Sequence, residues 1–196
     1  MRFTIDRMGA DGESHILILG LGNVLLRDEG LGVRALERLA AVHELPEQVQ
    51  TLDGGTLGLT LLPFLEGKSH LLVLDAVQTG GPPGTLARLD YADLSPGLLL
   101  KMSAHQTGLQ ELLALGDLQG CLPRHIVVCG LQPEAIEWGV DLSPAVADRI
   151  DLLVDMALEE LRRWGKTEIG DQRSEIRKNN KKLPLPSALW PLTSGF

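Results

Sequence analysis

Runs that have the length and composition of strands alternate with amphipathic runs along most of the chain. Four runs are predicted to be parallel strands: 15–20, 48–53, 70–77 and 124–130. Four runs are predicted to be helices: 29–42, 56–67, 103–116 and 143–165. Parallel strands need long crossover connections, and helices usually supply them. The alternation therefore predicts an α/β fold of three layers, in which a mostly parallel sheet lies between helices.

A fifth strand is predicted at 85–90, where TLARLD alternates between polar and apolar residues. It follows the strand at 70–77 after a link, 78–84, that is rich in glycine and proline. This link is too short for a helical crossover. We therefore predict that the 85–90 strand runs antiparallel to its neighbour.

The remaining segments differ from this core in composition. Residues 1–14 are polar, with scattered glycine, and we predict a flexible N-terminal extension. Residues 15–165 are expected to form a single α/β domain. Residues 166–196 combine many basic residues with three prolines. Such a segment buries little apolar surface, so we predict a mobile tail.

Charge and composition argue against several classes of protein. The net charge of −8 disfavours binding to nucleic acid, whose phosphates require a basic surface. No run approaches the roughly 20 apolar residues of a membrane span, and the first residues lack the apolar core of a secretory signal. Two cysteines are too few for a disulfide scaffold. We therefore expect a cytoplasmic protein with neither a nucleic-acid nor a membrane partner.

Three polar residues are predicted to lie at the carboxyl edge of the sheet, where open α/β folds bind their ligands. Glu29 follows the first strand, Asp75 ends the strand at 70–77, and His105 lies in the first turn of the helix at 103–116. Two carboxylates and one imidazole suit a divalent transition metal with open coordination positions. The same residues also have ordinary explanations. Acids favour the first turn of a helix, an aspartate can cap a turn, and a histidine can bond to a backbone carbonyl.

A phosphate site is the main competing interpretation of the first loop. Gly20-x-Gly22 begins like a dinucleotide-binding loop, but Leu25 stands where the third glycine is required. A nucleotide- or cofactor-binding module therefore stays as an alternative. Asp53 precedes Gly54 and Gly55, where it could approach a substrate or only cap the turn. The sequence contains neither a Gly-x-Ser-x-Gly elbow nor a His-Glu-x-x-His pattern.

Five blocks, in order, resemble the hydrogenase maturation endopeptidases. They are ILGLGNVLLRDEGLGVRAL (18–36), LDGGTLGL (52–59), LLVLDAV (71–77), SAHQTGL (103–109) and GLQPEAIEWGVDLSPAV (130–146). The resemblance spans residues 16 to about 162. It implies a twisted five-stranded sheet between helices. It also implies an endopeptidase that removes the C-terminal extension from the nickel-loaded precursor of a nickel–iron hydrogenase large subunit, which would be its partner.

The resemblance assigns roles to matching residues. It implies that Glu29, Asp75 and His105 contact the metal, and that Asp53 positions the substrate or takes part in catalysis. Gly54, Gly55 and Thr56 would lie near the docked tail of the precursor. The metal would be nickel carried by the substrate, and zinc or cadmium could occupy the same site in vitro.

The cleavage step is left open by the sequence. The metal could assist hydrolysis, Asp53 or Asp75 could act as base on a water, or the precursor's own metal site could labilise the bond. A chaperone that binds the tail of the large subunit without cutting it is a further alternative.

Overall fold

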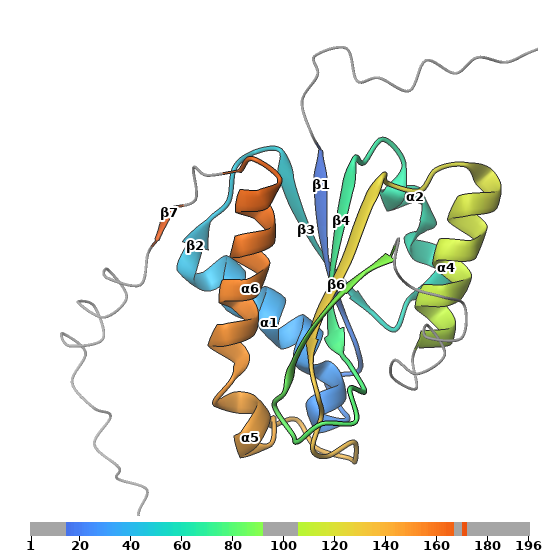
Figure 1. The fold of residues 1–196 in the computed structure, drawn as a ribbon. Coiled ribbons are helices and arrows are strands. Elements are labelled where there is room, and N and C mark those ends of the chain that lie inside the picture. The colour runs from blue at the N-terminus through green and yellow to red at the C-terminus, as the bar shows by residue number, and fades with distance from the viewer. Residues whose placement is uncertain (1–14, 92–105, 167–169, 172–196) are drawn as a thin grey trace, which may run out of the picture.

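A computed structural model of the chain describes residues 15–91, 106–166 and 170–171. Five strands form one sheet in the order β3-β1-β4-β6-β5, with helices on both faces (Figure 1). The strands are β1 (Ile16–Leu21), β3 (Val49–Gly55), β4 (His70–Ala76), β5 (Leu86–Asp90) and β6 (His125–Leu131). This arrangement confirms the predicted three-layer α/β fold.

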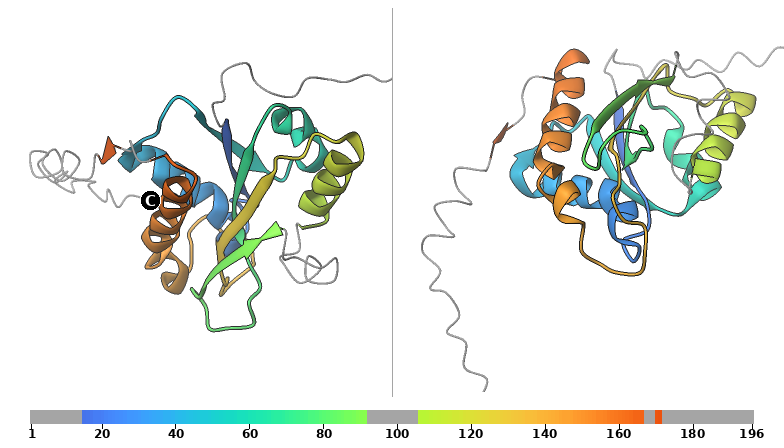
Figure 2. Two further views of the ribbon diagram at one scale, coloured as in Figure 1. Left: turned by 45° about the horizontal axis from the view of Figure 1, so that its top comes forward. Right: turned by 60° about the horizontal axis from the view of Figure 1, so that its bottom comes forward.

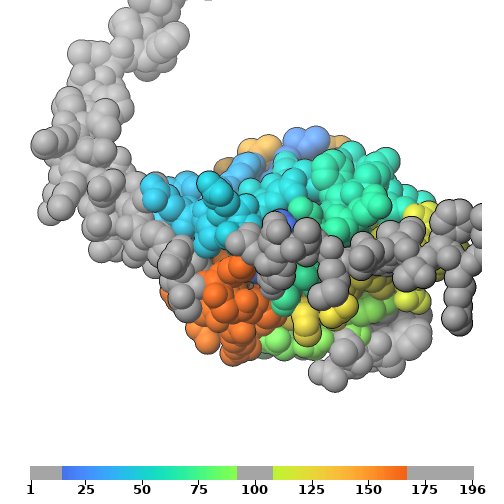
Figure 3. All heavy atoms as spheres, turned by 90° about the horizontal axis from the view of Figure 1, so that it is seen from above, coloured from blue at the N-terminus to red at the C-terminus, as the bar shows by residue number. Residues whose placement is uncertain are grey.

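Strand β5 has the predicted direction. β1 pairs in parallel with β3 and β4, and β4 pairs in parallel with β6. β5 runs antiparallel to β6 rather than beside β4, the strand before it in the chain. The reason is that β1 and β6 already occupy the two sides of β4. The carboxyl ends of the parallel strands point down in Figure 1, and Figure 3 looks from above onto their amino ends.

Two helical layers cover the sheet (Figure 2). One contains α1 (Leu31–Val42), α5 (Pro144–Ala147) and α6 (Ile150–Arg163). The other contains the 3₁₀ turn η2 (Gly58–Leu61), α2 (Leu62–Leu65) and α4 (Gln106–Gln119). Side chains alternate along a strand, so Ile16 and Ile18 of β1 pack under the first layer and Leu17 and Leu19 under the second. This two-sided burial explains why β1 is apolar throughout.

Several predicted helices differ in extent from the observed ones. The helix at 29–42 begins with a 3₁₀ turn, η1 (Arg27–Gly30), before α1. The helix at 56–67 is reduced to η2 and α2, because Gly58 has a positive φ of 52° and Pro63 lies within the next turn. The helix at 143–165 divides into α5 and α6.

A two-stranded sheet lies outside the main one. β2 (His43–Glu44) pairs antiparallel with β7 (Gly170–Asp171), so two residues of the predicted tail are paired. The rest of the tail beyond residue 166 and residues 1–14 lie outside the described part of the chain, and their mobility stays a prediction. Within the described residues, no helix combines the length and the apolar character that crossing a membrane would require.

Candidate active site at the carboxyl edge of the sheet

Glu29 and Asp75 lie at the same edge of the sheet. Gly20 of β1 pairs with Leu74 of β4, and Asp75 follows directly. Glu29 lies in η1, the turn after β1 that packs against β4. Both carboxylate residues are 1% exposed. The structure therefore buries two of the three predicted metal ligands at neighbouring strand ends.

Two glycines allow the backbone around Glu29 to pack this closely. Gly22 has a φ of +114°, and a Cβ there would lie 1.7 Å from the carbonyl oxygen of Glu29. A Cβ on Gly32 would lie 2.1 Å from the carbonyl oxygen of Leu74. These glycines hold η1 and α1 against the sheet. The buried carboxylates of Glu29 and Asp75 would repel a phosphate at this edge, which counts against the nucleotide-site alternative.

Arg27, two residues before Glu29, has a strained backbone conformation. It is the one non-glycine residue with a positive φ, 51°, among the residues the structure describes. Its N–H donates to the carbonyl oxygen of Gly139 over 2.9 Å, and its guanidinium lies 2.7 Å from the carboxylate of Glu137. Such strain persists only where the surroundings hold it in place, and it gathers at functional sites.

Asp28 has a structural role that the sequence did not reveal. Its buried carboxylate accepts hydrogen bonds from the N–H groups of Glu134 and Ala135, both at 2.9 Å. It also accepts bonds from the N–H and the hydroxyl of Ser143, both at 2.7 Å. Burial alone would raise the pKa of Asp28, but these four bonds outweigh it and lower the pKa. Asp28 is therefore an ionised anchor, and its acceptor sites are used by the protein.

The same contact accounts for the side chain of Ser143. The residue occupies the N-cap position of α5, but it makes no side-chain capping bond. Its hydroxyl donates to Asp28 instead. The only sequence signal for this pairing was that both residues belong to blocks of the family resemblance, which says nothing about contact.

The carboxylate of Asp75 is held by the backbone at the end of its own strand. Its Oδ1 accepts the N–H of Ala76 over 2.7 Å. On the side of β6, a Cβ on Gly130 would lie 2.2 Å from the carbonyl oxygen of Asp75. The close approach of β6 therefore restricts the backbone that carries this carboxylate.

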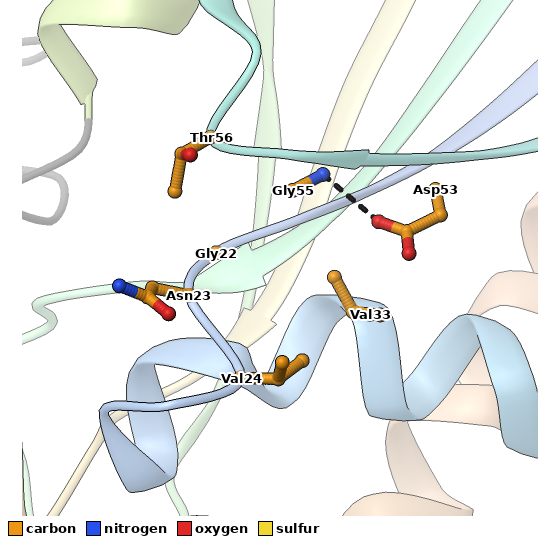
Figure 4. A pocket seen from close by; sticks show the side chains of 7 residues that line it. All are labelled: Gly22, Asn23, Val24, Val33, Asp53, Gly55 and Thr56. Atoms are coloured by element: carbon orange, nitrogen blue, oxygen red, sulfur yellow. Dashed lines mark hydrogen bonds between the residues drawn. The ribbon is translucent and has the colours of Figure 1, made fainter. Parts of the chain in front are cut away.

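Asp53 lies beside a small pocket of about 170 Å³, lined by Gly22, Asn23, Val24, Val33, Asp53, Gly55 and Thr56 (Figure 4). Its side chain is exposed, and its Oδ1 accepts the N–H of Gly55 over 3.0 Å. Gly55 and Thr56 are thus at a surface that a substrate could reach. Gly54 faces the core, where a Cβ would lie 2.6 Å from Leu19.

His105 lies outside the described residues, and its place in the site stays a prediction. α4 begins at the next residue, Gln106. A Cβ on Gly108 would lie 3.3 Å from the Cα of Gly58, so the first turn of α4 lies against the chain just beyond Thr56. Within the described part of the chain, no three His, Cys, Asp or Glu side chains form a metal-binding group.

The comparisons with known proteins identify the family. The hydrogenase maturation protease family (HycI) matches residues 33–160. The chain is 48% identical over 161 residues to the hydrogenase expression/formation protein HupD of Rhodobacter capsulatus, covering 81% of this chain and 76% of that protein. It is 37% identical over 151 residues to the hydrogenase 2 maturation protease of Escherichia coli, covering 76% and 92%.

Solved structures give the same answer. The hydrogenase maturating endopeptidase HybD from E. coli superposes with a TM-score of 0.72 at 37% identity, covering 77% of this chain and 94% of that one. A maturation protease HybD from Thermococcus kodakarensis superposes with a TM-score of 0.63 at 28% identity, covering 74% and 97%. The fold, the buried acids and these matches together show that the chain belongs to the hydrogenase maturation protease family.

Proposed function

We propose that this hydrogenase maturation protease removes the C-terminal extension of a nickel-loaded large-subunit precursor and recognises the nickel through Glu29, Asp75 and His105. The observation that carries the proposal is the burial of Glu29 and Asp75 at adjacent strand ends, each 1% exposed. His105 is included because it matches the histidine of the family's SAHQ block and because α4 begins at the next residue, Gln106.

The chemistry of these groups supports a cation as their ligand. A buried carboxylate is poorly hydrated, so a cation near it is attracted more strongly than it would be in water. Imidazole and carboxylate are both ligands that nickel accepts. A precursor without nickel would lack this cation, so the same groups would distinguish loaded from empty substrate.

Asp53 is our candidate for the proton-accepting group in the cleavage step. It lines the pocket, is exposed to water, and is oriented by the N–H of Gly55. The metal would polarise the scissile carbonyl or lower the pKa of a water, while Asp53 takes up the proton. Asp75 is the alternative base, but its burial makes it better suited to holding the cation.

A protein substrate also fits the surface beside the site. Leu25 and Trp138 are 51% and 82% exposed. They belong to two segments that a bridge between Leu26 and Gly139 joins. Large exposed apolar side chains often mark a surface that binds another protein. We therefore place the body of the precursor on this surface and its tail at the pocket.

The test is mass spectrometry of nickel-loaded precursor incubated with the full chain. Wild type should release the C-terminal peptide, whereas Glu29→Gln and His105→Ala should release none while keeping the wild-type circular dichroism spectrum. Glu37→Gln is the matched control, because that acid forms only an exposed ion pair with Arg34. Full cleavage by Glu29→Gln or His105→Ala would refute nickel recognition by these groups. Binding without release by wild type would support the non-cleaving chaperone instead.

A further inference from the structure

We propose that Asp28 and Gln132 are positioning residues that set the spacing of Glu29 and Asp75, by clamping the segments that carry both acids to one loop, residues 132–143. This inference rests on the proposed function of Glu29 and Asp75 as cation ligands. The loop connects β6 to α5, and neither Asp28 nor Gln132 is assigned a contact with the cation.

Asp28 provides the first half of the clamp. It lies next to Glu29 in η1, and its carboxylate binds both ends of one stretch of the loop, at Glu134 and Ala135 and again at Ser143. The N–H of Asp28 also donates to the carbonyl oxygen of Ala135 over 3.2 Å. The turn that carries Glu29 is therefore held by side-chain and backbone bonds to the same loop.

Gln132 provides the second half. It lies at the start of the loop and is buried. Its Oε1 accepts the N–H groups of Thr79 and Gly80, at 2.7 and 3.0 Å. Its Nε2 donates to Gln78 Oε1 over 2.9 Å. Residues 78–80 follow β4 after one residue, Val77, so these bonds hold the segment that leaves Asp75.

The two halves act on a single continuous segment. Residues 78–80 and η1 each contact the loop at a different point, and the backbone of the loop links these points. The N–H of Val77 donates to Leu131 over 2.9 Å, which fixes β4 to the residue just before the loop. Ligands need to be held to within about 0.5 Å to bind a metal well, and residues behind the ligands supply this restraint. Asp28 and Gln132 are the side chains placed to do so here.

Cadmium affinity of the full chain tests the clamp, with the metal alone as probe. Asp28→Asn replaces one carboxylate oxygen with an NH₂ donor, which would face the N–H groups of the loop. Gln132→Met removes every side-chain hydrogen bond from residue 132 to residues 78–80. Each should weaken cadmium binding by about 10- to 100-fold and shift the ¹¹³Cd resonance. Leu158→Ala is the stability control, because this residue of α6 is buried in the core and its side chain is apolar. It should change cadmium affinity by less than about twofold, measured where all variants are folded.

Glu29→Gln separates the two hypotheses. If it weakens cadmium binding while Asp28→Asn and Gln132→Met bind like Leu158→Ala, the clamp is wrong. If Glu29→Gln binds cadmium like wild type, the proposed ligand set is wrong.

Amide exchange tests the clamp without a metal. Asp28→Asn should speed exchange at Thr79 and Gly80 by at least about tenfold relative to Leu158→Ala, because loosening one end of the loop frees the other. The milder Ser143→Ala, which removes one bond of four, should shift exchange in the same direction. Unchanged exchange at Thr79 and Gly80 in both variants would contradict the clamp.

Discussion

Both edges of the parallel sheet carry titratable side chains. The surroundings of Asp28 at the carboxyl edge favour its charged form, whereas those of His70 at the amino edge disfavour its charged form. At the carboxyl edge, Asp28, Glu29 and Asp75 are buried, and the bonds to Asp28 lower its pKa and favour its charged form. At the amino edge, the ring of His70 stacks on that of His125 with 4.6 Å between ring centroids and lies 4.7 Å from that of Trp164.

At the amino edge, the surroundings of His70 disfavour its charged form. Burial, followed by the positive charges of His125 and Lys166, lowers the pKa of His70 to about 4. Ser69 Oγ lies 2.8 Å from His70 Nδ1 and donates to the carbonyl oxygen of His15. Residue type alone therefore does not distinguish a ligand from a packing residue. The groups around each side chain decide it: hydrogen bonds favour the charged form of Asp28, whereas burial favours the neutral form of His70.

The largest expected effect is on processing. Asp75→Asn should lower cleavage of nickel-loaded precursor by about 10²–10⁴-fold, because the amide loses the charge that holds the cation and any capacity to act as base. Asp90→Asn is the control from the opposite edge, since Asp90 ends the antiparallel strand β5. Initial rates by mass spectrometry check both variants. Equal losses in the two would mean that the edges do not differ in function.

The next effect is on stability. Gly32→Ala should cost about 3 kcal/mol or more in the free energy of unfolding, because its Cβ would overlap the carbonyl oxygen of Leu74 at 2.1 Å. Gly67→Ala should cost only about 1 kcal/mol, from its positive φ, since nothing lies within 4 Å of a Cβ there. Urea unfolding measures both. Similar costs would show that the close approach of α1 to the sheet is not required.

Acid should destabilise the amino edge by a smaller amount. The pKa of His70 is depressed to about 4 from 6.5, so its contribution is complete above pH 6.5 and is lost as the pH falls toward 4. Between pH 7.5 and 4.5, wild type should lose about 2 kcal/mol more than His70→Phe, which keeps an aromatic ring but cannot titrate. Urea unfolding at the two pH values gives the comparison. Equal losses of stability in wild type and His70→Phe would show that His70 is not the cause.

The smallest effect concerns binding of the precursor. Trp138→Ala should raise the KM for precursor by about three- to tenfold with little change in kcat, because it removes exposed apolar surface from the proposed docking face. Leu118→Ala is the control, since that residue of α4 is 83% exposed. A KM unchanged by Trp138→Ala would place the precursor elsewhere.

The sequence predicted most of the fold because each strand and helix has a local signature. β1 is apolar at every position, which only a strand buried on both faces requires, and the short link 78–84 required β5 to reverse direction. The sequence did not predict the break between α5 and α6, since neither glycine nor proline marks it. It also could not show that β5 pairs with β6, because that pairing is decided by which strands already flank β4.

The site was predictable only in part. Glu29 follows one strand and Asp75 lies near the end of another strand of the same parallel sheet, so the topology places both at one edge. The role of Asp28 depends on Ser143, a residue 115 positions away, and no local pattern encodes such a contact. The sequence offered only the preference of acids for helix starts, which explains Asp28 and Glu29 equally well. Their surroundings separate them, because the bonds from the loop at 134–143 give Asp28 its structural role.

The most direct test of the account is anomalous scattering from cadmium in crystals of the full chain. The account predicts one cadmium ion at the carboxyl edge of the sheet, bound by carboxylate oxygens of Glu29 and Asp75 and by a ring nitrogen of His105. A cadmium ion held by other residues, or side chains of these three that point apart around an ion-free edge, would contradict it.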